Sequence, residues 1–433
     1  MKFLIGLTLL AVSVSAVAVP EIQTWRTENG ARVYFVETHE IPMVQISVAF
    51  DAGSARDPVD RPGLAHLTSA MLDEGAGDSS SDFIAQRLES VGAVFGSDNG
   101  RDMSIAELRS LSDPKMLDVA VDVFADIVAR PRFPEDALAR EKDRALVRLA
   151  QRKQSPQEVA QTEFYASLFR THPYASPPEG EEAGIKALVR ADLLDFHKRY
   201  FTGGNAVVAI VGDLTRRDAQ AVAATIVGGL PAGKPAPPLG SVNTLERATA
   251  KNIEFPSTQS HVLLGQPGVS RGDPDYFPLY VGNHVLGGSG LVSRLSVEIR
   301  EKRGLAYSVY SYFVPMRELG PYLIGLQTRN DQIPVALEVV QDTVERFVAE
   351  GPTEAELEAA KKNITGAFPL NLDSNKKIAG NVLNIAFYGL PLDYLNTYTE
   401  NIERVTRDQV RDAFKRRVDP KRLVRVIVGG DNA

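Results

Sequence analysis

The chain repeats itself at low similarity, and this internal repeat limits the folds that its 433 residues can adopt. Arg56, Asp57 and Pro58 follow an alternating apolar strand, and Gly272, Asp273 and Pro274 follow another strand 216 positions later. The predicted helices that begin near Asp192 and Asp408 are also 216 positions apart. A constant offset between such landmarks indicates two structural units with the same order of elements.

Each half contains segments with the two-residue hydrophobic period of a strand and segments with the 3.6-residue period of a helix. Residues 44–50 alternate apolar and polar side chains, which is typical of a strand, whereas the segments after Pro114 and Pro334 have the 3.6-residue period of an amphipathic helix. The predicted fold class is therefore α+β, with two homologous halves that each pack a largely antiparallel sheet against helices.

A Pro/Gly-rich stretch lies near the midpoint. Prolines at 231, 235, 237 and 238 cannot continue a helix or a central strand, so we expect a stiff, extended connector. The predicted division is an N-terminal half at residues 19–230, a linker at 231–248 and a C-terminal half at 249–433.

The first residues have the pattern of an export signal. Lys2 precedes an apolar run from Phe3 to Val14, and Ala16 and Ala18 form a small-residue cleavage site. We expect residues 1–18 to be a signal peptide, with an uncleaved anchor as the alternative. No later apolar run reaches the roughly 20 residues that a membrane span needs, so no membrane insertion is expected.

Composition excludes several classes of function. The chain has no cysteine, which rules out disulfides, thiolate metal ligands and a cysteine nucleophile. Its net charge of −7 argues against nucleic acid as a partner, because that binding depends on clustered cations.

Several short segments carry a family resemblance. Gly63, Leu64, Ala65 and His66 lie within residues 61–76, and further matching segments follow at 171–174, 286–288, 300–308 and 388–391. In this order they resemble the pitrilysin/insulinase metallopeptidase family. The resemblance implies that the two halves form half of a clamshell peptidase chamber, and together with the export signal it implies a periplasmic location.

The zinc motif of that family is degenerate here. The family motif is His-x-x-Glu-His on a helix, in which two histidines bind zinc and the glutamate activates water. His66 matches the first ligand, but Ser69 stands at the position of the general base and Ala70 at the second ligand. The family's third ligand position falls on Val147. We expect no catalytic residue and no metal site in this chain.

Other polar residues are weaker candidates for a metal site that differs from the family's zinc motif. Asp73 is about 10 Å from His66 along a helix axis, which is too far for both to bind one ion. A site assembled by folding from His172, His197 or Glu141 stays open as an alternative.

The second half contains a different pair of candidate functional residues. In the family, an arginine at a helix end and a tyrosine seven residues later hold the substrate backbone near the scissile bond, and Arg300 and Tyr307 match that spacing. A guanidinium and a phenol can both donate hydrogen bonds to a peptide carbonyl. Without the resemblance, Arg300 would be read as part of the charged run 298–303 of a solvated helix.

The resemblance implies a non-catalytic, substrate-binding subunit of a heteromeric periplasmic zinc metalloendopeptidase that cleaves peptides. A homologous subunit with an intact zinc motif would be the partner and would hold the zinc, whereas this chain would bind no cofactor. The alternatives are an inactive scaffold or peptide-binding protein of the same family, and an autonomous metallopeptidase with an atypical zinc site.

Overall fold

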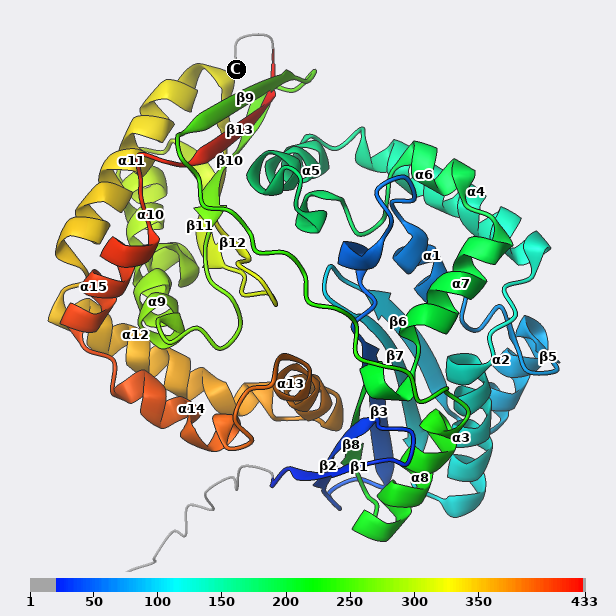
Figure 1. The fold of residues 1–433 in the computed structure, drawn as a ribbon. Coiled ribbons are helices and arrows are strands. Elements are labelled where there is room, and N and C mark those ends of the chain that lie inside the picture. Colours follow the sequence, from blue (N-terminus) through cyan, green and yellow to red (C-terminus); the bar gives the residue numbers. More distant parts are fainter. Residues whose placement is uncertain (1–20, 431–433) are drawn as a thin grey trace, which may run out of the picture.

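Two sheets organise residues 21–430, which the computed structural model describes. The expected signal peptide at residues 1–18 lies outside this range. The first sheet has the order β1-β2-β8-β3-β7-β6 (Figure 1). Its strands are β1 (Gln23–Arg26), β2 (Arg32–Glu37), β3 (Met43–Phe50), β6 (Val94–Asn99), β7 (Ser104–Leu111) and β8 (Ala206–Gly212), and a separate two-stranded ribbon joins β4 (Gly75–Ala76) to β5 (Ser79–Ser80).

The second sheet repeats the first without a counterpart of β1. Its order is β11-β12-β10-β13-β9, and each sheet contains one parallel pairing, β2 with β8 and β9 with β13, among antiparallel ones. The predicted α+β class with largely antiparallel sheets is confirmed. The strands are β9 (Thr249–Glu254), β10 (Gln259–Pro267), β11 (Ala306–Phe313), β12 (Pro321–Arg329) and β13 (Val424–Gly429).

Helices accompany each sheet, and their starts follow the sequence signals. Asp113 caps the helix that begins at Pro114, and Pro334 lies in the first turn of its counterpart, because proline suits a helix start. The first half contains α1 (Leu64–Ala70), α2 (Ser81–Ser90), α3 (Pro114–Ala129), α4 (Glu135–Arg152), α5 (Pro156–Phe169), α6 (Glu182–Ala187), α7 (Arg190–Tyr200) and α8 (Arg216–Gly228). The second contains α9 (Tyr276–Asn283), η4 (His284–Gly288), α10 (Arg294–Ser296), η6 (Val297–Glu301), α11 (Ile333–Glu350), α12 (Glu354–Ala367), α13 (Asn375–Tyr388), α14 (Tyr394–Glu403) and α15 (Arg407–Arg417).

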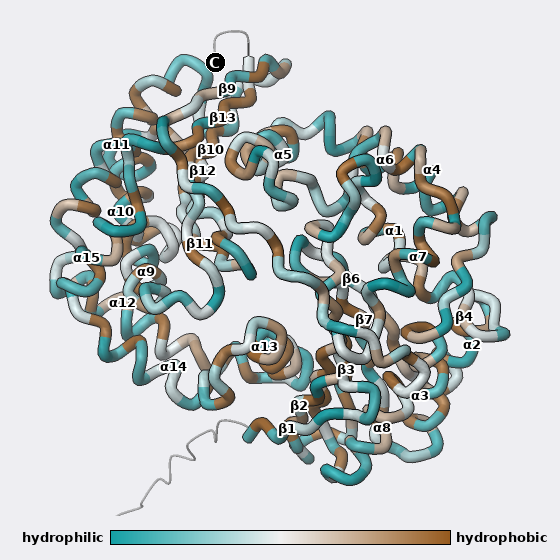
Figure 2. The backbone as a smooth tube through the Cα atoms, viewed as in Figure 1, coloured by the Kyte–Doolittle hydropathy of each residue, from teal (hydrophilic) through white to brown (hydrophobic). Residues whose placement is uncertain are grey.

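The two halves exchange one helix each. Helix α13 of the second half packs on β8, β3 and β2 of the first sheet, and α5 of the first half packs on β10 and β13 of the second (Figure 1). The apolar side chains of each exchanged helix form a shared core with strands of the opposite half. Hydrophobic stretches are visible in α13 and in β3 at this contact (Figure 2). Each sheet is therefore covered on one face by its own helices and on the other by a helix from the opposite half.

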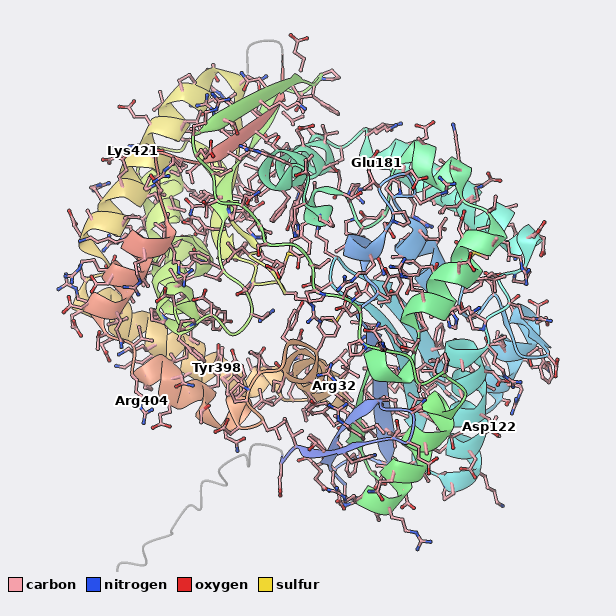
Figure 3. The ribbon with its side chains drawn as sticks, viewed as in Figure 1. Arg32, Asp122, Glu181, Tyr398, Arg404 and Lys421 are labelled. Atoms are coloured by element: carbon pink, nitrogen blue, oxygen red, sulfur yellow. The ribbon has the colours of Figure 1, made fainter. Side chains whose placement is uncertain are left out.

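Polar contacts accompany both exchanged helices. Arg32 on β2 donates a hydrogen bond to the carbonyl of Ala386 on α13 at 3.1 Å, and Figure 3 labels Arg32 beside that helix. On the other side, Glu163 of α5 forms an ion pair with Lys251 of β9 at 2.6 Å. Both contacts join the outer part of one sheet to the helix supplied by the other half.

A buried carboxylate connects the halves between these helices. Asp102, in the turn between β6 and β7, is only 5% exposed. It accepts hydrogen bonds from the Tyr174 hydroxyl, from the backbone N–H of Arg317 at 2.8 Å and from the Tyr388 hydroxyl at 3.0 Å. Because Arg317 and Tyr388 belong to the second half, this carboxylate fixes the position of one half relative to the other.

The segment between α8 and β9 contains no helix or strand. It is nevertheless held in place, because Gly203 and Gly204 donate backbone hydrogen bonds to the carbonyls of Pro231 and Ala232. Among residues 21–430, none of the helices combines the length and the hydrophobicity that a membrane span requires.

Replacing Asp102 by alanine should destabilise the whole protein. The Asp102→Ala change leaves three buried or half-buried donors without their acceptor, and we expect a loss of about 3 kcal/mol in the free energy of unfolding. Urea unfolding followed by circular dichroism measures this loss. Asp118→Ala, on an exposed position of α3, serves as the control and should change stability by less than about 0.5 kcal/mol. Equal stability of the two variants would show that the junction is dispensable.

Candidate functional site

The degenerate zinc motif lies on the short helix α1. The carboxylate of Asp57 accepts hydrogen bonds from the backbone N–H groups of Gly63 and Ala65, at 2.7 and 2.8 Å, and so fixes the start of this helix. His66 occupies the first turn and is half-buried. Burial lowers the pKa of His66 below its ordinary value, so its imidazole is neutral near pH 7.

The other three motif positions cannot bind zinc. Ser69 is 2% exposed, and its hydroxyl donates to the carbonyl of Asp98 on β6 at 3.3 Å. Ala70 offers no ligand atom. Val147, on α4, is 57% exposed and has no ligand atom either. The donor set therefore does not fit the family's zinc ion, because one imidazole replaces the three protein ligands of a catalytic zinc site.

Two acids lie near α1, but they form no ligand set. Glu141 on α4 is buried and forms an ion pair with Arg144. Burial raises the pKa of Asp73, and the nearby charges of Glu74 and Glu141 raise it further. Across residues 21–430 there is no group of three or more histidine, aspartate and glutamate side chains that could hold a metal ion.

The two remaining candidate histidines have structural contacts elsewhere. His172 contacts the carbonyl of Gly240 through Nε2 at 2.8 Å and accepts a hydrogen bond from the backbone N–H of Tyr174. His197 donates from Nε2 to the carbonyl of Val128 at 2.9 Å, and its ring stacks on Phe201 at 4.6 Å. The structure does not bring either residue into a site with His66.

Arg300 and Tyr307 do lie together. The Arg300 guanidinium carbon is 4.7 Å from the centre of the Tyr307 ring, a cation–π distance. Tyr307 is the extra residue of a β-bulge, because β11 pairs with β12 through Ala306 and Ser308 but not through Tyr307. The bulge turns its side chain outward, where it is 81% exposed.

The Arg300 guanidinium is available to a ligand. Its neighbours Lys302 and Arg303 both form ion pairs with Glu298. The Arg300 side chain itself makes no hydrogen bond or ion pair with any residue between 21 and 430. The pair thus presents several donors to solvent, which is what recognition of a peptide carbonyl or a developing oxyanion requires.

Gly287, which precedes Arg300 in the chain, allows a close approach of two backbone segments. A Cβ at Gly287 would lie only 2.7 Å from the backbone nitrogen of Ser311 on β11. Asn283 donates a hydrogen bond to the Ser311 carbonyl at 2.7 Å in the same place. The chain itself therefore covers the middle of this edge strand, a contact that sequence analysis did not foresee.

The polar and aromatic face of β11 was not predicted from the sequence. Ser308, Tyr310 and Tyr312 alternate along the strand, and all three line one cavity between the halves. The signal was present in their two-residue spacing, which places side chains on one face of a strand. What covers that face depends on α5, which is distant in sequence.

Family models match both halves. Residues 32–181 match the model described as insulinase (peptidase family M16), and residues 187–364 match that of the peptidase M16 inactive domain. The crystal structure of a peptidase M16 inactive domain from Pseudomonas fluorescens is 40% identical, has a TM-score of 0.92 and aligns over 95% of this chain and 98% of that one. A protease structure from Helicobacter pylori shares the fold, with a TM-score of 0.87 and 19% identity over 95% of this chain and 100% of its own.

Two further relatives are similar over nearly the whole length. An uncharacterised zinc protease of Mycobacterium leprae is 29% identical over 93% of this chain and 90% of its own. A protein of Helicobacter pylori named as a non-peptidase homolog is 27% identical over 99% of this chain and 98% of its own. The relatives thus include proteins named as proteases and proteins named as inactive.

His197 should make the protein sensitive to acid. Burial lowers its pKa to about 4, against 6.5 for an ordinary histidine. Below pH 6.5 the unfolded chain binds a proton at His197 that the folded chain does not bind. The free energy of unfolding therefore decreases as the pH is lowered. The loss from this one residue should reach about 3 kcal/mol at roughly pH 4.

Unfolding in urea at several pH values, for the wild type and for His197→Gln, measures this dependence. Glutamine keeps a donor for the Val128 carbonyl but does not titrate. The variant should therefore lose less stability between neutral and acid pH than the wild type does. Parallel pH profiles would contradict this role for His197.

Proposed function

Because this chain belongs to the insulinase family of peptidases, family M16, we propose that it is the non-catalytic, substrate-binding subunit of a heteromeric periplasmic zinc metalloendopeptidase. Its similarity to a peptidase M16 inactive domain and to a non-peptidase homolog identifies it as an inactive member of the family. The subunit role, the partner and the location are the proposal.

The single observation that carries the proposal is the contrast between the two halves. In the first half, the position of the general base is a buried serine that donates to Asp98, so no group there can activate water. In the second half, the Arg300 guanidinium lies over the ring of Tyr307, which is 81% exposed. A chain that keeps the donors for a peptide backbone but not the catalytic group is suited to holding a substrate for another active site.

The partner would supply what this chain lacks. We propose a homologous subunit with an intact zinc motif, which would contribute the zinc ion, the catalytic glutamate and the second wall of the chamber. Arg300 and Tyr307 would then hold the carbonyl groups of the substrate beside that zinc. Donors aimed at a developing oxyanion contribute about 2 to 4 kcal/mol to transition-state stabilisation.

The location rests on the sequence. The export signal expected at residues 1–18 would carry the chain out of the cytoplasm, and the lack of cysteine removes any dependence of its stability on disulfide formation there.

A reconstitution experiment tests the proposal. The mature protein is assayed for peptide cleavage alone, and mixed with a zinc-motif relative from the same organism, with the zinc content measured in each case. We expect cleavage in the mixture only. Arg300→Gln should lower kcat about 100-fold without changing the zinc content, and Tyr307→Phe should lower it about 10-fold, because each removes a donor to the substrate.

Arg346→Gln is the matched control, since Arg346 pairs with Asp342 on the exposed surface of α11. This variant should leave cleavage unchanged. Cleavage in the mixture that is indifferent to both Arg300 and Tyr307 would favour a scaffold role instead. Zinc-dependent cleavage by this protein alone would overturn the proposal in favour of an autonomous peptidase.

A further inference from the structure

A cavity of about 390 Å³ lies where α5 of the first half meets the second sheet. This volume falls within the range of roughly 300–1,000 Å³ that is usual for ligand sites. Four elements form its walls: α5, β10, β11 and β12. The lining residues are Gln157, Ala160, Gln161, Phe164, Tyr165, His261, Val262, Leu263, Ser308, Tyr310, Tyr312, Leu323, Leu326 and Gln327.

The lining carries no net charge. It contains no aspartate, glutamate, lysine or arginine. Its one histidine, His261, is neutral near pH 7 because burial lowers its pKa. Three tyrosines and three glutamines supply the polar atoms instead. A charged group that entered this cavity would lose water without gaining a counter-ion, whereas an uncharged group would not incur that cost.

The aromatic wall is held in place before any ligand binds. The ring of Tyr310 lies across Gly325 of β12, where a Cβ would approach its Cζ to 2.4 Å. The rings of Tyr310 and Tyr312 are 5.3 Å apart. The side chains of Gln157 and Gln161, on the opposite wall, make no hydrogen bond within residues 21–430.

The cavity borders the strand residue that follows the proposed substrate-holding pair. Ser308 lines it and directly follows Tyr307, whose ring contacts Arg300. Since an extended peptide advances by about 3.3 Å per residue, a chain held at Tyr307 places another of its side chains near the cavity within a few residues.

We propose that this cavity is a specificity subsite for a large, uncharged apolar side chain, aromatic or aliphatic, of the peptide that Arg300 and Tyr307 hold. The inference rests on the proposed function and adds the substrate class to it: extended peptides with such a residue close to the held carbonyl. Burial of that side chain against Tyr310, Tyr312 and Leu323 provides the binding energy.

Calorimetry with the isolated mature protein tests the subsite. The probes are two synthetic nonapeptides of alanine and serine, blocked at both ends, with phenylalanine or glutamate at the centre. The phenylalanine peptide should bind roughly 10- to 100-fold more tightly, as expected for burial of one aromatic side chain. Ser308→Phe fills the cavity and should remove this preference by weakening only the phenylalanine peptide.

Two further variants serve as a control and as a replacement for Ser308→Phe. Val335→Phe places a phenylalanine on the exposed surface of α11 instead and should change neither affinity. If Ser308→Phe does not fold, Gln161→Trp fills the cavity from the exposed side of α5. A wild type that binds both peptides equally, or neither, overturns the inference, as does a preference that survives filling of the cavity.

The same measurements separate the subsite from the proposed function. Arg300→Gln acts on the peptide backbone, so it should weaken both peptides by a similar factor. If it does so while the phenylalanine preference is absent, the subsite is wrong and the substrate-holding role stands. If the preference is present but Arg300→Gln changes neither affinity, the cavity binds peptides and the role given to Arg300 is wrong.

Discussion

The exchange of α5 and α13 is the constraint on which the rest of the structure depends. A sheet buried on both faces needs a cover on each, and here one cover always comes from the opposite half. All seven residues of β8 are buried for this reason, between its own helices and α13. Neither half could separate without exposing apolar strand residues to water, which disfavours separation by the hydrophobic effect.

This packing explains why the polar junction can be small. Asp102 links the β6–β7 turn to Arg317 and Tyr388, but the apolar helix contacts on either side already bring these groups together. Water is excluded from this site. The three hydrogen bonds that the Asp102 carboxylate accepts compensate for its desolvation and fix the relative position of the halves. The cavity between α5 and β11 depends on that fixed position.

The two halves have diverged at equivalent places in the fold. In the first half, Ser69 at the degenerate motif donates to the edge strand β6, so the position of the family's general base has a structural contact here. In the second half, Asn283 and Gly287 cover the edge strand β11 at Ser311, and the open part of that strand begins at the bulged Tyr307.

The sequence by itself determined the two-half α+β architecture, the family and the loss of the zinc ligands at Ala70 and Val147. These features depend on local periodicity, on helix-start signals such as Pro114 and on residue identity, all of which can be read along the chain. Sequence resemblance also named Arg300 and Tyr307, but the bulge that turns Tyr307 outward arises from its pairing with β12. Only the tertiary structure decided that α13 covers the first sheet, that Asp102 meets Tyr388 across 286 positions and that a neutral cavity borders β11. Amphipathic periodicity marks which face of a helix is apolar, but it does not specify which surface covers that face, because that choice depends on the packing of both halves at once.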